Sequence, residues 1–156
     1  TVMPARARSR RGGCMSTPRY RAWKFLHPDL SREASTGLTL SPRGGITMVD
    51  DRESVGQAIL LLLSTLPGER VMRPEYGCQL HRLVFSPNDG TTAGLAIHYV
   101  RQALDLWEPR IDVLHLDAGQ VADYPEQLMI SLAYQVRATQ QRDTLTFFFN
   151  LAGGKN

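Results

Sequence analysis

Three carboxylates stand where the chain is expected to pass from one structural element to the next, which raises the question of catalysis. Glu69, Glu75 and Glu108 could bring two acids together in a cleft, the arrangement that cleaves a glycosidic bond. Each of them, however, has an arginine within two positions along the chain. A neighbouring cation stabilises the charged carboxylate, whereas a general acid must hold its proton. We therefore expect ion-paired structural corners and no catalytic residue.

The remaining residue types that carry chemistry have no productive spacing. The histidines are His27, His81, His98 and His115, and no pair of them has the spacing of metal ligands. Cys78 has no CxxC partner and is expected to be a small core residue. No nucleophile elbow, phosphate-binding glycine loop or dinucleotide fingerprint is present in the sequence. The sequence predicts neither a metal site nor a cofactor.

The motif Glu108-Pro109-Arg110 is a more specific polar signal than any single acid. Proline fixes φ, the glutamate can accept hydrogen bonds, and the arginine can donate through its forked guanidinium. The motif stands between a predicted helix and a predicted strand. Two interpretations stay open with equal weight: an intramolecular clamp that holds the corner, and a docking point for another subunit. Both can hold at once.

Two amphipathic helices are expected to position these residues. The first is predicted over residues 51–65, where Asp50 ahead of Arg52-Glu53 matches an acidic capping box. Leu60 and Leu61 widen its apolar face, which indicates burial on more than one side.

The second helix begins at a cap provided by Asn88 or Asp89 and keeps its apolar period to Trp107. It should end at Glu108, because the residue before a proline is disfavoured in the helical region.

Beyond the second helix the hydrophobic period changes to two, which is typical of strands. Strands are predicted near residues 111–116, 128–136 and 145–151, with a polar turn at residues 140–143. One face of the long strand carries Leu128, Ile130, Leu132, Tyr134 and Val136. We expect an α+β fold, with two main helices packed on a small antiparallel three-stranded sheet that ends in a C-terminal hairpin. Residues 38–40 and 46–48 predict a short N-terminal hairpin, and residues 20–36 should be irregular.

Composition separates a basic arm from the rest of the chain. The net charge is +3, yet the first 28 residues hold seven basic side chains and no acid. We expect residues 1–30 to form a disordered basic arm and residues 31–152 to form a single domain. Binding of nucleic acid by the arm is the less favoured alternative. The longest apolar run is too short to cross a bilayer, and two cysteines favour a reducing cytoplasm.

One continuous segment, followed by Glu108-Pro109-Arg110-Ile111, resembles the signature of the contractile-tail baseplate wedge family. This is the GPW family, also called "gene 25-like lysozyme", to which a type VI secretion component belongs. The segment consists of Pro67, Gly68, Glu69, Arg70, Val71, Met72, Arg73, Pro74, Glu75, Tyr76 and Gly77, followed by Leu80 and Phe85. The resemblance covers about residues 37–151, and two motifs in the family's order make it specific.

The resemblance implies a structural role in place of an enzymatic one. Family members sit in the inner baseplate, six copies per particle, among other wedge and hub subunits. They serve as the platform on which the contractile sheath begins to polymerise, and strands of the sheath protein add to their sheet. Assembly in the cytoplasm, no membrane insertion and no cofactor are expected with that role. Peptidoglycan cleavage, which the lysozyme label suggests, is the alternative.

The last predicted strand is the expected place for strand addition. Its apolar residues Leu145, Phe147, Phe148 and Phe149 would make an exposed monomer prone to aggregation unless a partner covered them. A small meander also leaves strand edges with unpaired backbone groups. We expect these four residues, together with Glu108-Pro109-Arg110, to contact partners. Phage tail, type VI system and extracellular injection particle all remain open as the host machine.

Overall fold

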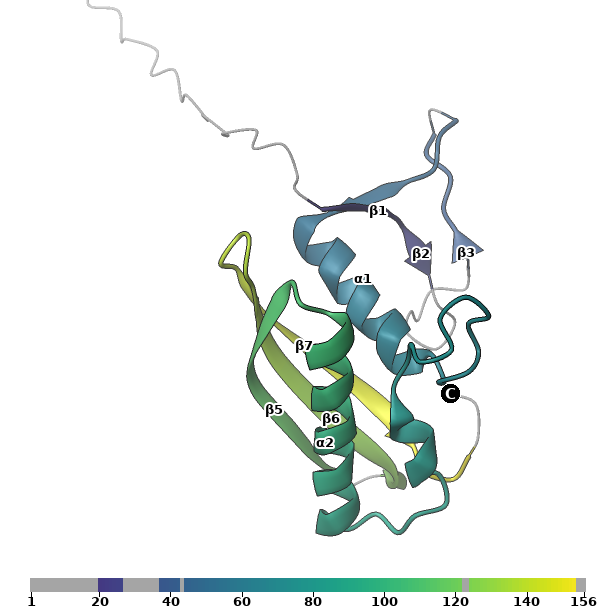
Figure 1. Ribbon diagram of the computed structural model, residues 1–156, viewed down its shortest axis with the longest axis vertical. Helices are drawn as coiled ribbons and strands as arrows, with labels where there is room; N and C mark the ends of the chain where they lie inside the picture. The colour runs from purple at the N-terminus through teal and green to yellow at the C-terminus, as the bar shows by residue number, and fades with distance from the viewer. Residues whose placement is uncertain (1–19, 27–36, 43, 122–123, 154–156) are drawn as a thin grey trace, which may run out of the picture.

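A computed structural model describes residues 20–26, 37–42, 44–121 and 124–153 (Figure 1). Most of the predicted basic arm, including residues 1–19 and 27–30, lies outside these described residues. The described part consists of two long helices, a three-stranded sheet and two short strand pairs. This arrangement confirms the predicted α+β fold.

The two helices form where the apolar spacing predicts them. Helix α1 spans Asp51–Ser64 and helix α2 spans Gly90–Trp107. The carboxylate of Asp89 accepts a hydrogen bond from the Thr92 amide at 2.8 Å, which confirms one of the two proposed caps. A short 3-10 helix, η1 (Gln79–Leu83), lies between α1 and α2 in the chain.

The predicted capping box of α1 is wrong. Asp50 lies in strand β4 (Met48–Asp50), which pairs with strand β1 (Arg21–Trp23). The carboxylate of Asp50 accepts a hydrogen bond from Nε of Arg21 at 3.1 Å and makes no cap hydrogen bond to α1. Arg21, which is distant in the sequence, therefore binds the Asp50 carboxylate that the local spacing had assigned to the helix cap.

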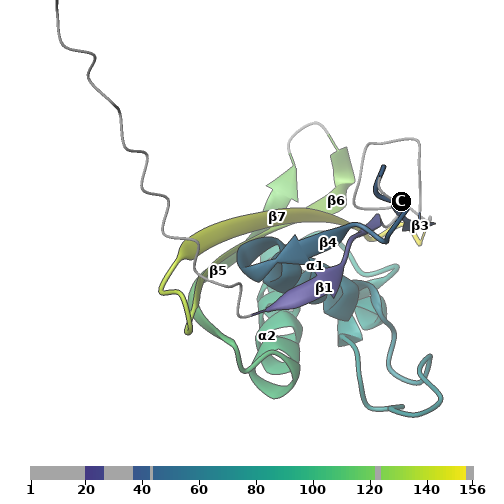
Figure 2. The ribbon, with the colours of Figure 1, turned by 90° about the horizontal axis from the view of Figure 1, so that it is seen from above.

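The main sheet is an antiparallel meander with the order β5-β6-β7. Strand β5 spans Ile111–Val121, β6 spans Tyr124–Val136 and β7 spans Arg142–Asn150. In Figure 1 α2 lies across the sheet, and α1 lies beside α2 toward β7. Viewed from above, β7 is a long curved strand that runs across the molecule, with β6 on one side of it and α1 on the other (Figure 2). Each of the three strands has more residues than the range predicted for it, and their order along the chain is as predicted.

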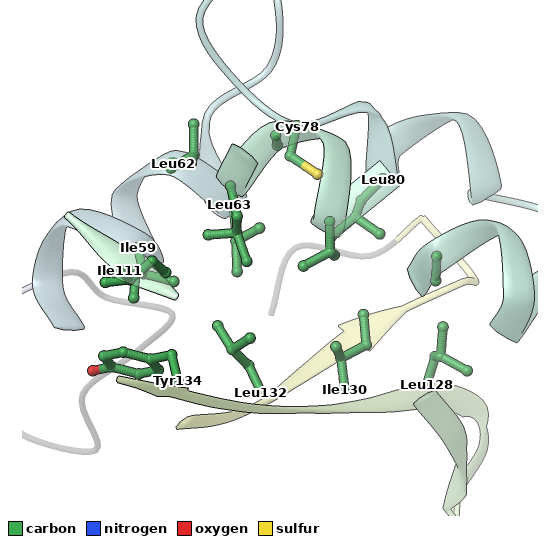
Figure 3. Close-up of a cluster of buried hydrophobic side chains, with 14 of the residues drawn as sticks. Ile59, Leu62, Leu63, Cys78, Leu80, Ile111, Leu128, Ile130, Leu132 and Tyr134 are labelled. Atoms are coloured by element: carbon green, nitrogen blue, oxygen red, sulfur yellow. The ribbon is translucent and has the colours of Figure 1, made fainter. Parts of the chain in front are cut away.

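The core lies between the helices and one face of β6. All five predicted inward residues of this strand, Leu128 to Val136 in steps of two, are fully buried. Figure 3 shows four of them, Leu128, Ile130, Leu132 and Tyr134, rising from β6 toward Leu62, Leu63, Cys78 and Leu80. Burying each large aliphatic side chain stabilises the fold by about 1.5–3 kcal/mol. The predicted place of Cys78 in the core is confirmed, and burial raises the pKa of its thiol.

The N-terminal strands partly contradict the prediction of irregular structure over residues 20–36. Besides the β1–β4 pair, β2 (Phe25–Leu26) pairs antiparallel with β3 (Gly37–Leu38). Each strand is only two or three residues long, and its partner lies later in the chain. An alternation of apolar and polar residues over two or three positions is too short to predict a strand when the pairing partner is unknown. The predicted hairpin is confirmed by the Leu40–Ile46 bridge and by the bond from Ser41 N to Gly45 O at 2.6 Å.

Candidate functional site

The corner after α2 is held by an ion pair across Pro109. Nη2 of Arg110 donates to Oε2 of Glu108 at 2.6 Å, and Nε of Arg110 donates to Oε1 of the same carboxylate. Glu108 is only 6% exposed, whereas the arginine side chain is 30% exposed. The hydrogen bond to the carboxylate raises the pKa of the Arg110 guanidinium. The clamp predicted from the sequence is therefore present, while Pro109 itself is exposed.

The surrounding backbone explains why the clamp forms there. The amide of Glu108 closes the last turn of α2 by donating to Leu104 O at 2.9 Å. Strand β5 begins three residues later, at Ile111. The carbonyl of Arg110 accepts a hydrogen bond from the Arg137 amide at 2.9 Å, which ties the corner to the end of β6. The clamp thus joins a helix end to two strands.

The family-motif segment folds into a closed loop between α1 and η1. Gly68 N donates to Pro74 O at 2.7 Å, and Cys78 N donates to Thr65 O at 3.0 Å. Gly77 has φ +135°, and a Cβ at this position would lie 2.5 Å from the oxygen of Thr65. Only glycine fits that approach, so the loop depends on its sequence for its shape.

Aromatic contacts connect the motif loop to the Glu108 corner. The guanidinium of Arg70 lies 4.0 Å from the centre of the Tyr76 ring. Tyr76 in turn meets Trp107 edge to face, with ring centres 5.3 Å apart. Burial raises the pKa of the Tyr76 hydroxyl. The two family motifs, which stand apart in the sequence, therefore meet in one cluster.

A further contact brings the N-terminal part of the chain to the same corner. The guanidinium of Arg110 lies 5.2 Å from the centre of the Tyr20 ring. Tyr20 is anchored at the start of α1, because its amide donates to the carboxylate of Asp51 at 3.0 Å. Sequence reasoning missed Tyr20, since no local pattern relates it to Arg110.

The motif glutamates do not form the expected ion pairs. Oε2 of Glu69 accepts a hydrogen bond from the Leu66 amide at 2.9 Å. Among the described residues no ion pair includes Glu69 or Glu75. Arg70 stacks on Tyr76 instead of pairing with its neighbour. The prediction fails because sequence proximity does not decide where an arginine on a loop points.

Two apolar side chains stand at the tip of the motif loop. Val71 is 94% exposed and Met72 is 92% exposed. Phe85, also in the family signature, is 82% exposed with φ 66°, and its amide donates to Leu151 O at 2.6 Å. Leu80 is buried in the core, and Pro74 and Glu75 are exposed on the loop. The signature thus mixes residues that shape the fold with residues on the surface.

Strand β7 is one of the two edge strands of the main sheet as described, and β5 is the other. The bonds from Leu151 N to Glu126 O and from Val136 N to Gln141 O show that the odd-numbered residues of β7 are bonded to β6. Even-numbered residues therefore direct their backbone groups away from β6. The side chains of Leu145, Phe147 and Phe149 pack against the core, and that of Phe148 is half exposed on the opposite face.

A groove with a mixed lining runs beside this edge, in which apolar side chains stand together with Ser64, His81 and Gln127. It has a volume of about 870 Å³ and lies between β7, the C-terminal half of α1 and η1. Its wall opposite β7 includes Leu60, Leu63 and Leu66. One signal for this groove was present in the sequence, since Leu60 widens the apolar face of α1 beyond what one contact surface requires. No sequence pattern could show that β7 forms the other wall.

A second ion pair holds the hairpin end of β7 and was not predicted. Nε of Arg52 donates to Oδ2 of Asp143 at 2.7 Å, and Nη2 of Arg52 donates to Oδ1. This guanidinium lowers the pKa of the Asp143 carboxyl. The buried hydroxyl of Tyr134 lies 3.3 Å from the same carboxylate, and its pKa is raised by burial. The pair joins the first turn of α1 to the β6–β7 hairpin.

Within the residues that the structure describes, no three His, Cys, Asp or Glu side chains gather as metal ligands. None of the described helices is long and apolar enough to pass through a membrane. What the described chain brings together is a clamp, a loop and a sheet edge.

Comparison with known proteins points to one family. The model of a family described as baseplate wedge protein gp25 matches residues 49–141. This stretch includes both sequence motifs and ends at the start of β7. No curated protein matches the chain.

Solved structures of this fold include several baseplates. The chain is 41% identical to a Geobacter sulfurreducens protein named as a tail lysozyme, over 67% of this chain and 96% of that one, with a TM-score of 0.61. It is 19% identical to a chain of the sixfold-symmetrised anti-feeding prophage baseplate, over 86% of both chains, with a TM-score of 0.59. A chain of the type VI secretion baseplate complex is 17% identical, over 64% of this chain and 92% of that one, with a TM-score of 0.52. The last two likenesses show a shared fold.

Proposed function

This chain belongs to the family of baseplate wedge protein gp25, and we propose that it is a structural baseplate subunit that templates the first ring of a contractile sheath. In this role a strand of the sheath protein adds to β7, and the corner at Glu108 and Arg110 docks on wedge or hub subunits. The particle holds six copies, in keeping with the sixfold symmetry of one baseplate of the same fold. Assembly takes place in the cytoplasm, before the particle is complete.

The observation that carries the sheath part of the proposal is the outward-facing backbone of Thr146 on edge strand β7, beside the groove. Thr146 directs its N–H and C=O away from β6, and no described strand lies on that side. An added strand would pair with these groups and cover the groove at the same time. An edge of this kind invites aggregation in a free monomer unless a partner covers it.

Docking through the Glu108 corner is supported by its rigidity. The carboxylate is buried and bonded twice, so the position of the exposed Pro109 beside it is fixed. A preorganised contact loses little conformational entropy when a partner binds. The clamp and the docking role are compatible, because the clamp holds the surface that the partner would meet.

Catalysis is not part of the proposed role. The Glu69 carboxylate is bonded to a backbone amide, and the Glu108 carboxylate is held by Arg110. Both carboxylates are therefore already bonded within the chain, whereas glycosidic cleavage needs two acids placed at the substrate. The word lysozyme in the name of one similar protein is therefore not carried over to this chain as an activity.

The direct genetic test changes the backbone of β7 without breaking the sheet. Thr146→Pro removes the N–H that faces the open edge, and proline is tolerated at such a position of an edge strand. Thr146→Val keeps the N–H and serves as the matched control. We expect particles with Thr146→Pro to carry baseplates without sheath, and particles with Thr146→Val to be normal. Normal sheaths with Thr146→Pro would refute strand addition at β7.

The docking role has its own test. Exchanging the two charges, by Glu108→Arg with Arg110→Glu, is expected to block sheath assembly while the monomer stays folded. Because Glu108 is buried, an unfolding curve must accompany the assay, and Arg110→Lys provides a milder variant that keeps the charge and loses the fork. Normal assembly by a folded charge-exchanged protein would refute docking at this corner.

A further inference from the structure

The tip of the motif loop is a tight turn whose two central residues are both apolar. The Arg73 amide donates to the Arg70 oxygen at 3.1 Å, which places Val71 and Met72 at the central positions of the turn. Their side chains are 94% and 92% exposed, more than any other large apolar side chain among the described residues. The two side chains therefore contact almost none of the fold that carries them.

Turn chemistry does not explain these residue types. Central turn positions favour glycine, proline, asparagine, aspartate and serine, because these residues fit the turn backbone or bond to it. Valine is branched at Cβ and methionine has no hydrogen-bond donor, so neither Val71 nor Met72 helps the turn to form. Residues that break a local rule without a gain for the fold are expected at functional positions. Contact with another molecule would provide the burial that both side chains lack.

The rest of the loop holds the turn in one position. Gly68 N donates to Pro74 O at 2.7 Å, which closes the loop below the turn. The Arg70 guanidinium lies 4.0 Å from the centre of the Tyr76 ring, and Tyr76 meets Trp107 at the end of α2. Side chains on a fixed backbone lose little conformational entropy when they bind. The tip is thus a rigid projection that presents two apolar side chains.

The charged side chains beside the tip decide which class of partner fits it. Two acids and two arginines flank the apolar pair, and all four are exposed: Glu69, Arg70, Arg73 and Glu75. Their formal charges cancel, whereas a segment that binds an anionic membrane surface carries a basic excess. An apolar centre inside a polar rim is the anatomy of a protein interface, in which methionine and arginine are enriched. A protein is therefore the partner that the tip fits.

We infer that Val71 and Met72 form a plug that inserts into an apolar socket on a different protein of the baseplate. The inference rests on the chain being a baseplate subunit and goes beyond the β7 edge and the Glu108 corner, because it adds a third contact surface. A convex tip of two side chains needs a concave apolar partner, and polar groups at the mouth of the socket would meet the charged rim. Self-association through the tip is the competing arrangement, and it would join copies head to tail into rings or filaments.

Met72 itself serves as the probe, because an exposed thioether is oxidised to the sulfoxide. Dilute hydrogen peroxide is added to the free full-length chain and to assembled particles, and mass spectrometry follows each methionine over time. We expect Met72 to oxidise about tenfold or more slowly in the particle, with less slowing at Met48, which is 38% exposed in β4. An unchanged rate at Met72, or equal slowing at both methionines, would overturn the inference.

Polar variants of similar size test whether burial of the plug drives assembly. Val71→Thr with Met72→Gln makes the tip polar, and Leu106→Gln makes such a change on the exposed face of α2. Each variant is co-expressed with the wild type, and the ratio of the two chains in purified particles is compared with their ratio in the cell. We expect particles to be depleted of the tip variant about tenfold and not of the control. Incorporation of the tip variant at the wild-type level would overturn the inference.

The class of partner is tested on the free chain. The unfolding midpoint of the tip variant should equal that of the wild type, because both side chains are already exposed. We expect the tip to contribute neither to self-association, measured by sedimentation at a series of concentrations, nor to binding of phosphatidylcholine–phosphatidylglycerol vesicles. Self-association or vesicle binding that disappears with the tip variant would overturn the inference.

These outcomes are independent of the sheath proposal. If Thr146→Pro prevents sheath formation while Met72 stays as reactive in the particle as in the free chain, the inference alone fails. If Thr146→Pro leaves the sheath intact while Met72 is protected, strand addition at β7 fails and the plug remains. Loss of the sheath together with protection of Met72 is the result we expect.

Discussion

Arg110 reaches back across Pro109 and donates two hydrogen bonds to the nearly buried carboxylate of Glu108. This contact closes the corner between α2 and β5, and Tyr76 and Trp107 bring the motif loop beside it. Two motifs that are separate in the sequence are thus parts of one structure. The consequences of this arrangement, and those of the β7 edge, are measurable.

Arg110→Ala should destabilise the fold strongly. The substitution leaves the carboxylate of Glu108 buried without a cation, and breaking a buried pair in this way costs about 3–5 kcal/mol. Arg110→Lys keeps the charge but loses the fork, so we expect a loss of about half that amount. Chemical denaturation measures both values. A loss below about 0.5 kcal/mol for Arg110→Ala would mean that the clamp does not stabilise the corner.

Asp143→Asn should remove a contribution to stability that depends on pH. The bond from Arg52 lowers the pKa of the folded Asp143 below its ordinary 3.8. Such a group contributes its stability fully above pH 3.8 and loses it as the pH falls through the lower folded value. We expect the wild type to exceed Asp143→Asn by about 1 kcal/mol at neutral pH, because Arg52 is largely exposed.

The gap between wild type and Asp143→Asn should shrink below pH 3.8, and urea unfolding at a series of pH values measures it. Asp112→Asn breaks the pair with Arg137, in which both side chains are more than half exposed, and is the control with little expected effect. A gap that stayed constant through the acid range would contradict the role of the Arg52–Asp143 pair.

Gly77→Ala and Gly68→Ala should differ although both glycines have positive φ. A Cβ on Gly77 would lie 2.5 Å from the Thr65 oxygen, whereas a Cβ on Gly68 meets nothing within 4 Å. We expect a loss of about 1 kcal/mol for Gly68→Ala from backbone strain alone. Gly77→Ala should lose about 3 kcal/mol or more, since the loop must also move. Equal unfolding free energies for the two variants would contradict the close approach at Gly77.

The purified chain should leave peptidoglycan intact. Turbidity of a peptidoglycan suspension is the readout, and an active lysozyme at equal concentration is the control. The carboxylates of Glu69 and Glu108 already accept hydrogen bonds from the Leu66 amide and from Arg110, so we expect neither to act on a glycosidic bond. Clearing that disappeared with Glu69→Gln or Glu75→Gln would show that the chain is an enzyme.

Local patterns were sufficient for the parts of the fold that local forces shape. The alternation from Leu128 to Val136 specified the buried face of β6, because each inward residue meets the same core. The Asp89 cap and the end of α2 before Pro109 follow from backbone chemistry within a few residues. Glu108 and Arg110 are close enough in sequence for their clamp to be expected.

Contacts between distant segments could not be predicted in the same way. Asp50 joins Arg21 in a strand pair instead of capping α1, and Arg70 stacks on Tyr76 instead of pairing with Glu69. The groove needs Leu60 from α1 and Phe147 from β7 on opposite walls. Contacts between side chains that are distant in the sequence appear only in the folded chain, and the candidate docking surface depends on these contacts.

The most direct test of the sheath proposal is photo-crosslinking from the edge of β7 in assembled particles. A photoreactive amino acid at position 146 is activated by light, and the adduct is identified by mass spectrometry, with position 106 on α2 as the control. We predict an adduct with the sheath protein from position 146 and none from position 106. Crosslinks from position 146 only to other baseplate subunits would contradict sheath templating by β7.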